Sequence, residues 1–275
     1  AVQVTTLKPE WIRAYPVIYG GLTAPDYMLL DLFPNMTGYI CPPDYMKNLK
    51  FIEEVTGQKE VVVELDYTYT DSLLRNRLMG AEKEFPKDYR IIPVSVGSPA
   101  RNVSRDAVDA VGNAYLEQMY ASAKYYPHLQ VMLTPYSNAI MNKTNLPQFT
   151  ATDVQFADGT ARFVGGYLPS LETQVRDIVN YATKALQGTP LKNLPRMQHQ
   201  AEYFMDYDAM LRRDLVYDDW SDKATIVNAP FHVVHPMLYY SAFAFGLLLI
   251  SFATWFVFRL HFLMQHQRKD KVLSS

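Results

Sequence analysis

The chain has 275 residues, of which 49% are hydrophobic and 20% are charged, and its formal net charge at pH 7 is −2. This length is enough for one sizeable domain with its own core, or for two small ones. Its one cysteine, Cys41, excludes an internal disulfide and a zinc site built from several thiolates.

Residues 1–47 are rich in proline, tyrosine and glycine, which predicts irregular structure around one short helix near Asp26 to Phe33. The pair Gly20-Gly21 is not followed by Lys-Ser or Lys-Thr, so it is typical of a turn and not of a phosphate loop. The N-terminal sequence shows no initiator methionine, signal peptide or arginine-rich transit segment, and we expect a processed mature end.

From Lys59 onward, β-branched runs of strand length alternate with helical patterns. Strands are expected at Glu60 to Leu65, Arg90 to Val96 and Leu129 to Leu133, and helices from Asp71 to about Glu84 and from Ser104 to about Tyr125. This alternation of strand and helix predicts a small α/β unit.

The next segments mix both kinds of structure. Val154 to Val164 predicts a hairpin, because Asp158-Gly159 favours a tight turn between apolar runs. Ser170 is expected to cap an amphipathic helix that Gly188 and Pro190 end, and its apolar stripe comprises Leu171, Val175, Ile178, Val179, Ala182 and Leu186. Residues 191–228 predict a polar connector with a helix near Gln198 to Arg213. The expected fold class is therefore α+β, a mixed outer domain containing the small α/β unit, plus one C-terminal transmembrane helix.

Residues 236–258 contain no charged side chain. At about 1.5 Å per residue a helix of this length covers about 34 Å, enough to cross a hydrocarbon core of about 30 Å. The tail beyond it is basic, with Arg259, Arg268, Lys269 and Lys271 against one acid, Asp270. Positive residues stay on the side from which insertion occurs. The sequence thus predicts an outer domain (1–230), a span (236–258) and an inner tail (259–275).

We assign no catalytic, cofactor-binding or metal-binding residue, and the chain is predicted not to be an enzyme. His232 and His235 lie one helical turn apart, but His261 is far along the same helix and a metal site needs more ligands. His128 and His199 show no spacing that links them to Cys41 or to a serine. An anchored α/β enzyme with a pocket in residues 59–133 stays open as an alternative.

Three segments together resemble the cytochrome c1 family of the respiratory cytochrome bc complex. They are Gly20-Gly21 with Asp26-Tyr27, Thr37-Gly38-Tyr39 and Pro42-Pro43; Pro135-Tyr136 with Ala139-Ile140-Met141; and Phe156 to Thr160 with Gln174-Val175 and Asp177 to Val179. Haem attachment in that family needs Cys-x-x-Cys-His, whereas Cys41 is alone and is followed by Pro42. The resemblance therefore implies a haemless relative in which Met141, at the axial-ligand position, is a core residue. The alternative is that another polypeptide supplies the haem-bearing half.

The resemblance implies a non-catalytic accessory subunit of a mitochondrial inner-membrane respiratory-chain complex, with its domain in the intermembrane space and its tail in the matrix. The expected partners are other subunits of complex III or its supercomplex, the lipid bilayer and cytochrome c, which the domain would help to place for electron transport. The outer part is acidic, which excludes nucleic acid. Three sequons, at Asn35, Asn102 and Asn142, keep a second reading open: a type I membrane glycoprotein with a lumenal partner-binding domain.

Overall fold

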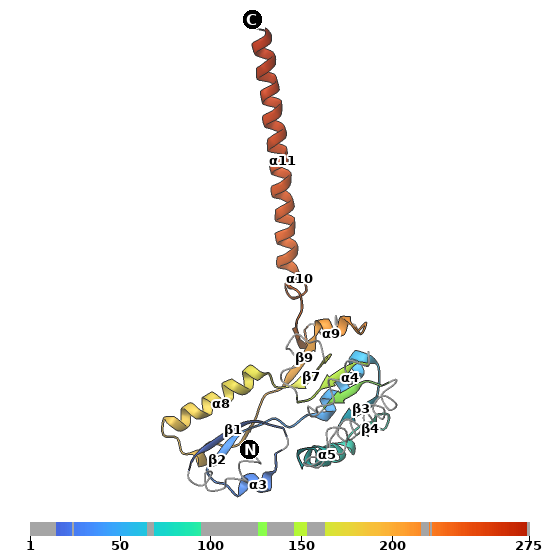
Figure 1. Ribbon diagram of the computed structural model, residues 1–275, viewed down its shortest axis with the longest axis vertical. Helices are drawn as coiled ribbons and strands as arrows, with labels where there is room; N and C mark the ends of the chain where they lie inside the picture. Colours follow the sequence, from blue (N-terminus) through green and yellow to red (C-terminus); the bar gives the residue numbers. More distant parts are fainter. Residues whose placement is uncertain are drawn as a thin grey trace, which may run out of the picture. The chain divides into compact units, whose positions relative to one another are not determined.

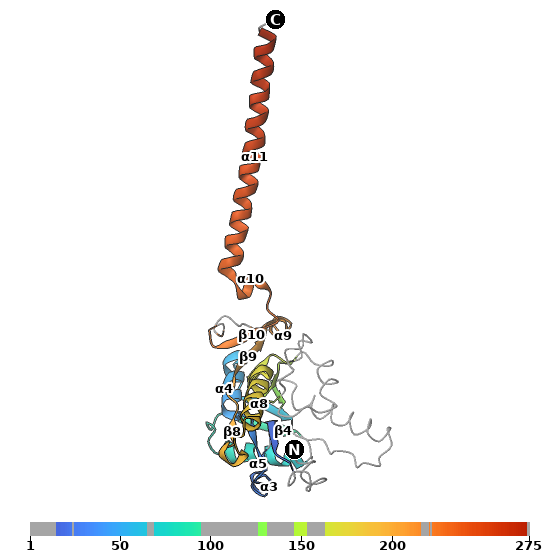
Figure 2. The ribbon, with the colours of Figure 1, turned by 90° about the vertical axis from the view of Figure 1, so that its left-hand side faces the viewer.

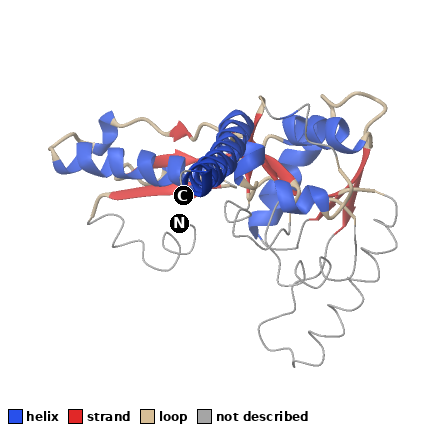
Figure 3. Ribbon diagram, turned by 90° about the horizontal axis from the view of Figure 1, so that it is seen from above, coloured by secondary structure: helices blue, strands red, loops and turns tan. Residues whose placement is uncertain are grey.

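The computed structural model describes residues 15–23, 25–64, 69–94, 126–130, 146–152, 163–215, 220 and 222–273. The chain divides into two compact units, Ala1–Asn228 and Ala229–Ser275. The strands described in the first unit form a 3-stranded and a 7-stranded sheet. Figure 3 shows these strands in red with helices, in blue, lying beside them.

The small sheet is parallel and has the order β1-β2-β8. Its strands are β1 (Val17–Leu22), β2 (Met36–Ile40) and β8 (Met197–Gln198), with α3 (Tyr27–Asp31) between the first two. The predicted short helix near Asp26 is confirmed, but the irregular structure expected around it is wrong for the described residues of 15–47, where β1 and β2 form. Gly38 explains part of this error, because a Cβ there would lie 2.0 Å from the backbone oxygen of Tyr19. Glycine at this position allows the two strand backbones to approach closely, and it does not mark a turn.

Helix α8 (Leu171–Leu186) packs against β1 and β2, as Figure 1 shows. The predicted cap is confirmed, since Ser170 accepts a hydrogen bond from the Thr173 backbone N–H. Only part of the predicted apolar stripe packs, because two of its six residues, Ile178 and Ala182, are half-buried. Gln174 and Tyr181 are buried, whereas the stripe residues Leu171, Val175, Val179 and Leu186 are exposed. Gly20 and Gly21 leave room for this packing, because a Cβ on Gly20 would collide with the Ile178 side chain and one on Gly21 with that of Gln174.

The large sheet has the order β10-β9-β7-β6-β5-β3-β4, and all its pairs are parallel except β7 with β9. Its strands are β3 (Glu60–Glu64), β4 (Arg90–Val94), β5 (His128–Gln130), β6 (Gln148–Thr150), β7 (Gly165–Leu168), β9 (Glu202–Asp206) and β10 (Ala224–Val227). The accompanying helices are α4 (Tyr45–Thr56), α5 (Tyr69–Glu82) and α9 (Tyr207–Leu211) (Figure 2). A 3-10 turn at Leu191–Asn193 contacts β2 of the small sheet. The first unit is therefore α/β with parallel sheets, which is broader than the small α/β unit expected.

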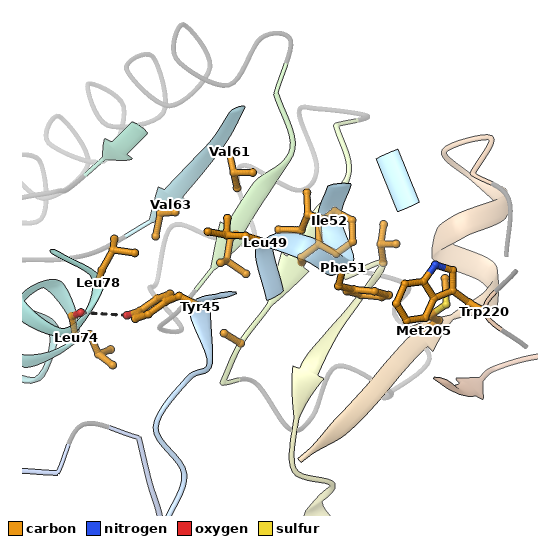
Figure 4. Close-up of a cluster of buried hydrophobic side chains, with 14 of the residues drawn as sticks. Tyr45, Leu49, Phe51, Ile52, Val61, Val63, Leu74, Leu78, Met205 and Trp220 are labelled. Atoms are coloured by element: carbon orange, nitrogen blue, oxygen red, sulfur yellow. Dashed lines mark hydrogen bonds between the residues drawn. The ribbon is translucent and has the colours of Figure 1, made fainter. Parts of the chain in front are cut away.

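The main core lies between α4, α5 and the large sheet (Figure 4). Helix α4 buries Leu49, Phe51 and Ile52 completely or nearly so. The Phe51 ring meets Trp220 with ring centroids 4.8 Å apart in an edge-to-face arrangement. The Tyr45 hydroxyl donates to the backbone oxygen of Leu74 at 3.1 Å, which joins α4 to α5. Buried β-branched and aromatic side chains of this kind are typical of parallel sheets covered by helices.

Several predicted elements can be compared directly. The strands expected at Glu60 and Arg90 are confirmed as β3 and β4, and the helix expected from Asp71 is α5, which begins at Tyr69. The helix expected near Gln198 to Arg213 is wrong, because this segment forms β8, β9 and then α9. β8 and the first part of β9 are poorly buried, so their sequence lacks the alternation of a half-buried strand. The helix at 104–125 and the hairpin turn at 158–159 lie outside the described residues.

The second unit contains α10 (Phe231–Val234) and α11 (Pro236–Leu273). Within α11, Pro236–Met264 has a mean hydropathy of 2.0 over its most apolar window, so by length and composition it can cross a membrane. The predicted span of residues 236–258 lies inside this range. The helix then continues without interruption through the basic segment to Leu273.

Candidate functional site

Three chain segments cross between the two sheets of the first unit. Residues 41–44 lead from β2 into α4, residues 169–170 lead from β7 into α8, and residues 199–201 lead from β8 into β9. All three crossings line one cavity of about 290 Å³. This cavity is the candidate site, because it lies where the two halves of an α/β unit meet.

His199 joins the third crossing to the small sheet. Its side chain is fully buried, and its Nδ1 lies 2.8 Å from Asp177 Oδ2 on α8. Its Nε2 accepts a hydrogen bond from the Gly21 N–H at 3.4 Å, and its ring stacks on Tyr39 with centroids 4.8 Å apart. Since Nε2 is an acceptor, Nδ1 carries the hydrogen atom and donates a hydrogen bond to the Asp177 carboxylate. The imidazole is therefore held in one tautomer and one orientation.

Asn48 joins α4 to β7, just before the second crossing. Its side-chain Oδ1 accepts from the Tyr167 N–H at 2.9 Å, and its Nδ2 donates to the Tyr167 carbonyl at 3.1 Å. The side-chain amide thus forms hydrogen bonds with both the N–H and the carbonyl of Tyr167, as the backbone of a neighbouring strand would. Asn48 is completely buried, so if these hydrogen bonds were lost, water could not replace them and its polar atoms would have no hydrogen-bond partner in their place.

Asp44 and Lys47 place the start of α4 at the cavity wall. Asp44 is the N-cap and accepts from the Lys47 backbone N–H at 3.0 Å. The Lys47 Nζ donates to the Tyr167 hydroxyl oxygen at 2.7 Å and lies 4.3 Å from the centroid of that ring. This hydrogen bond raises the pKa of Lys47, so the ammonium stays charged at neutral pH.

The cavity wall brings together residue types that occur in thiol hydrolases, but their arrangement does not make a nucleophile. Burial raises the pKa of the Cys41 thiol to about 12, so it is protonated at neutral pH. The Nε2 of His199, which would have to remove the proton, is already the acceptor for Gly21. Among the described residues there is also no group of three or more His, Cys, Asp or Glu side chains suited to a metal ion. The arrangement is suited to binding.

The histidines considered from the sequence are widely separated. His232 and His235 belong to the second unit and contact the Tyr239 and Phe231 rings, respectively. His261 lies on α11 and His128 on β5, while Met141 lies outside the described residues. Only His199 lines the cavity. Sequence spacing gave no signal for it, because its partner Asp177 is 22 residues away and its partner Gly21 is 178 residues away.

No family model and no curated protein matches this sequence. Its fold is similar to that of a conserved domain protein from Vibrio cholerae, with a TM-score of 0.54 and 14% identity over 78% of this chain and 71% of that one. It is also similar to an ABC domain in complex with L-Trp from Streptococcus pneumoniae, with a TM-score of 0.51 and 10% identity over 70% of this chain. The chain spans 63% of the length of that domain. A ligand-free, open substrate-binding protein from Clostridium difficile, CD0873, gives a TM-score of 0.49 at 10% identity, covering 71% of this chain and 63% of that one.

These similarities show that the resemblance to cytochrome c1 is wrong. The residues that suggested it serve the fold: Gly38 lies against the backbone of Tyr19, Gly21 lies under Gln174, and Asp177 holds His199. The expected accessory role in the respiratory chain is wrong as well, together with its partners complex III and cytochrome c. The mitochondrial compartment rested on the same resemblance and loses its support. The alternative reading, a type I membrane glycoprotein with a lumenal partner-binding domain, gains no support from these folds either.

Proposed function

We propose that this chain is a non-catalytic binding protein, anchored in a membrane, whose small-molecule ligand occupies the cavity between the three crossings. The observation that carries the proposal is the cavity itself, which all three connections between the two sheets line. A similar fold has been solved in complex with L-Trp. The volume of about 290 Å³ lies just below the range of about 300–1,000 Å³ for pockets that bind drug-sized ligands, which suits a metabolite the size of an amino acid.

The anchor is α11, with residues 1–230 as the outer domain, 236–258 as the membrane-spanning core and 259–275 as the inner tail. The tail cations support this orientation, because positive residues stay on the cytoplasmic side. Arg259 lies 5.2 Å from the Trp255 ring centroid, a pairing that suits the interface between lipid and water. The ligand would then be taken up outside the cytoplasm, and an ABC transporter is the partner that such a domain would supply.

A second role is favoured by one observation, the continuation of α11 as one helix from Pro236 to Leu273. A simple anchor needs about 20 residues. A helix that continues past the membrane can carry a change in the outer domain to the inner side, so the chain would report the ligand and not deliver it. Site-specific cross-linking at Lys271→Cys distinguishes the two roles: a reporting chain changes its cross-linking rate when ligand is added, and a delivering chain does not.

The binding function is tested with the full chain in lipid nanodiscs and a panel of the twenty amino acids, by thermal shift and then calorimetry. A true ligand at a concentration of about 100 Kd raises the free energy of unfolding by about 2.7 kcal/mol. Ala201→Trp places a large ring in the cavity, and Leu186→Trp places the same ring at a position that is 89% exposed. We expect binding to be lost in the first variant and retained in the second. Equal binding in both would refute this site.

A further inference from the structure

We infer that the cavity recognises a carboxylate, and that Lys47 and Tyr167 are the residues that bind it. This inference rests on the proposed function and adds the chemical class of the ligand. It follows from which charges and hydrogen-bond donors the cavity wall presents, and from which of them are already in use.

The charges of the wall favour an anion. Its fixed charges are those of Lys47 and Asp44. Asp44 is occupied as the N-cap of α4, where its oxygen accepts from a backbone N–H. The positive end of the helix dipole compensates its negative charge. With Asp44 compensated in this way, the Lys47 ammonium is the charge of the wall that remains for a ligand.

The hydroxyl of Tyr167 is turned into a donor by its neighbour. Its oxygen accepts a hydrogen bond from Lys47 Nζ at 2.7 Å, so its own O–H must point elsewhere. No acceptor for this O–H is found in the part of the chain that the structure describes. The ammonium has further N–H donors beside it. Two donors this close together can reach the two oxygens of one carboxylate, and hydrogen bonds to charged groups are the stronger ones.

His199 and Cys41, which also line the cavity, do not compete for this role. Both nitrogens of His199 are occupied, by Asp177 and by Gly21. The thiol of Cys41 is buried and protonated, so it adds no negative charge. The position of Tyr167 is also fixed, because Asn48 holds its backbone on both sides. The Lys47–Tyr167 pair is thus prepared before a ligand arrives, which lowers the entropy lost on binding.

The test uses the full chain in nanodiscs, with a panel of the twenty amino acids and of mono- and dicarboxylates with two to six carbons. The best-binding acid is then compared with its carboxamide, which has nearly the same shape but no charge. Lys47→Met removes the ammonium and keeps the apolar stem, Lys47→Arg restores a positive charge, and Tyr167→Phe removes only the hydroxyl. Lys50→Met is the matched control, since Lys50 is exposed on the same helix and does not line the cavity.

We expect Lys47→Met to weaken binding of the acid about 10- to 100-fold, and Tyr167→Phe about 2- to 10-fold. Lys47→Arg should recover part of the loss, and Lys50→Met should stay within about twofold of the unaltered chain. The carboxamide should bind the unaltered chain as weakly as the acid binds Lys47→Met, and Lys47→Met should affect it little. Unchanged melting temperatures of the variants without ligand show that folding is intact.

Two results would overturn the inference while leaving the binding function in place. One is equal affinity for the acid and its carboxamide. The other is a normal affinity of Lys47→Met for the acid while Ala201→Trp still abolishes binding. If Ala201→Trp has no effect on a ligand that binds, or if no member of the panel binds at all, the proposed function and this inference both fail.

Discussion

Replacing Phe51 with alanine tests how the core of the large sheet is held together. The side chain of Phe51 is completely buried. Its ring meets Phe149 at 5.7 Å and 85°, and Trp220 at 4.8 Å and 80°, both edge to face (Figure 4 labels Phe51 and Trp220). The Tyr203 ring lies 5.4 Å away on a third side. These neighbours come from β6, β9 and the segment after α9, so they cannot collapse together into the space that alanine would leave.

The size of the effect follows from this environment. Phe→Ala changes in cores cost about 3–5 kcal/mol, with larger values where the site cannot collapse. Edge-to-face pairs contribute about 0.5–1.5 kcal/mol each beyond the area they bury. We therefore expect Phe51→Ala to lower the free energy of unfolding by about 4–5 kcal/mol. This is a large part of the total of about 5–15 kcal/mol for a typical domain.

The assay is urea unfolding of the full chain in mild detergent, followed by near-ultraviolet circular dichroism, which reports the packed aromatic core and not the helicity of α11. Stabilities are compared from midpoints at a common slope. Leu186→Ala is the control, because Leu186 is 89% exposed and its loss should change stability by less than about 0.5 kcal/mol. If Phe51→Ala lowers stability no more than this control does, the packing described around Phe51 is not the basis of the core.

Three further outcomes are expected. Gln148 is completely buried, and neither polar atom of its amide has a hydrogen-bond partner among the residues that the structure describes. Gln148→Met should therefore raise the free energy of unfolding by about 1–2 kcal/mol, and a lower melting temperature would contradict this. The pKa of the Cys41 thiol is about 12 in the folded chain and 9.0 in the unfolded chain. The contribution of this group to the free energy of unfolding therefore falls as the pH rises between these two values, and it does not change with pH below them. Iodoacetamide should accordingly label Cys41 at pH 8 only after unfolding, and fast labelling of the native chain would show that the thiol is accessible. Leu248→Arg places a charge in the middle of the apolar stretch and should cost about 2.5–3.5 kcal/mol of insertion free energy. Membrane fractionation should show that less of this variant is retained in the membrane, whereas Lys271→Ala should have little effect. Equal retention of the two variants would mean that α11 does not span the membrane.

Local chemistry alone was enough to predict some elements. The apolar stretch within α11 follows from composition and length, the start of α8 from Ser170, and the strands β3 and β4 from runs of β-branched residues. Each of these depends on interactions between residues that are neighbours in the sequence. For that reason a single sequence is sufficient to find them.

The arrangement of the sheets and the candidate site were decided by the tertiary structure. β1 and β2 carry glycines that look like turn signals until Tyr19 and α8 are seen packed against them. The two contacts that fix the cavity join residues 119 and 22 positions apart, Asn48 with Tyr167 and Asp177 with His199. Spacings of this size leave no period in the sequence, because parallel strands bring such residues together only after each crossing connection has closed.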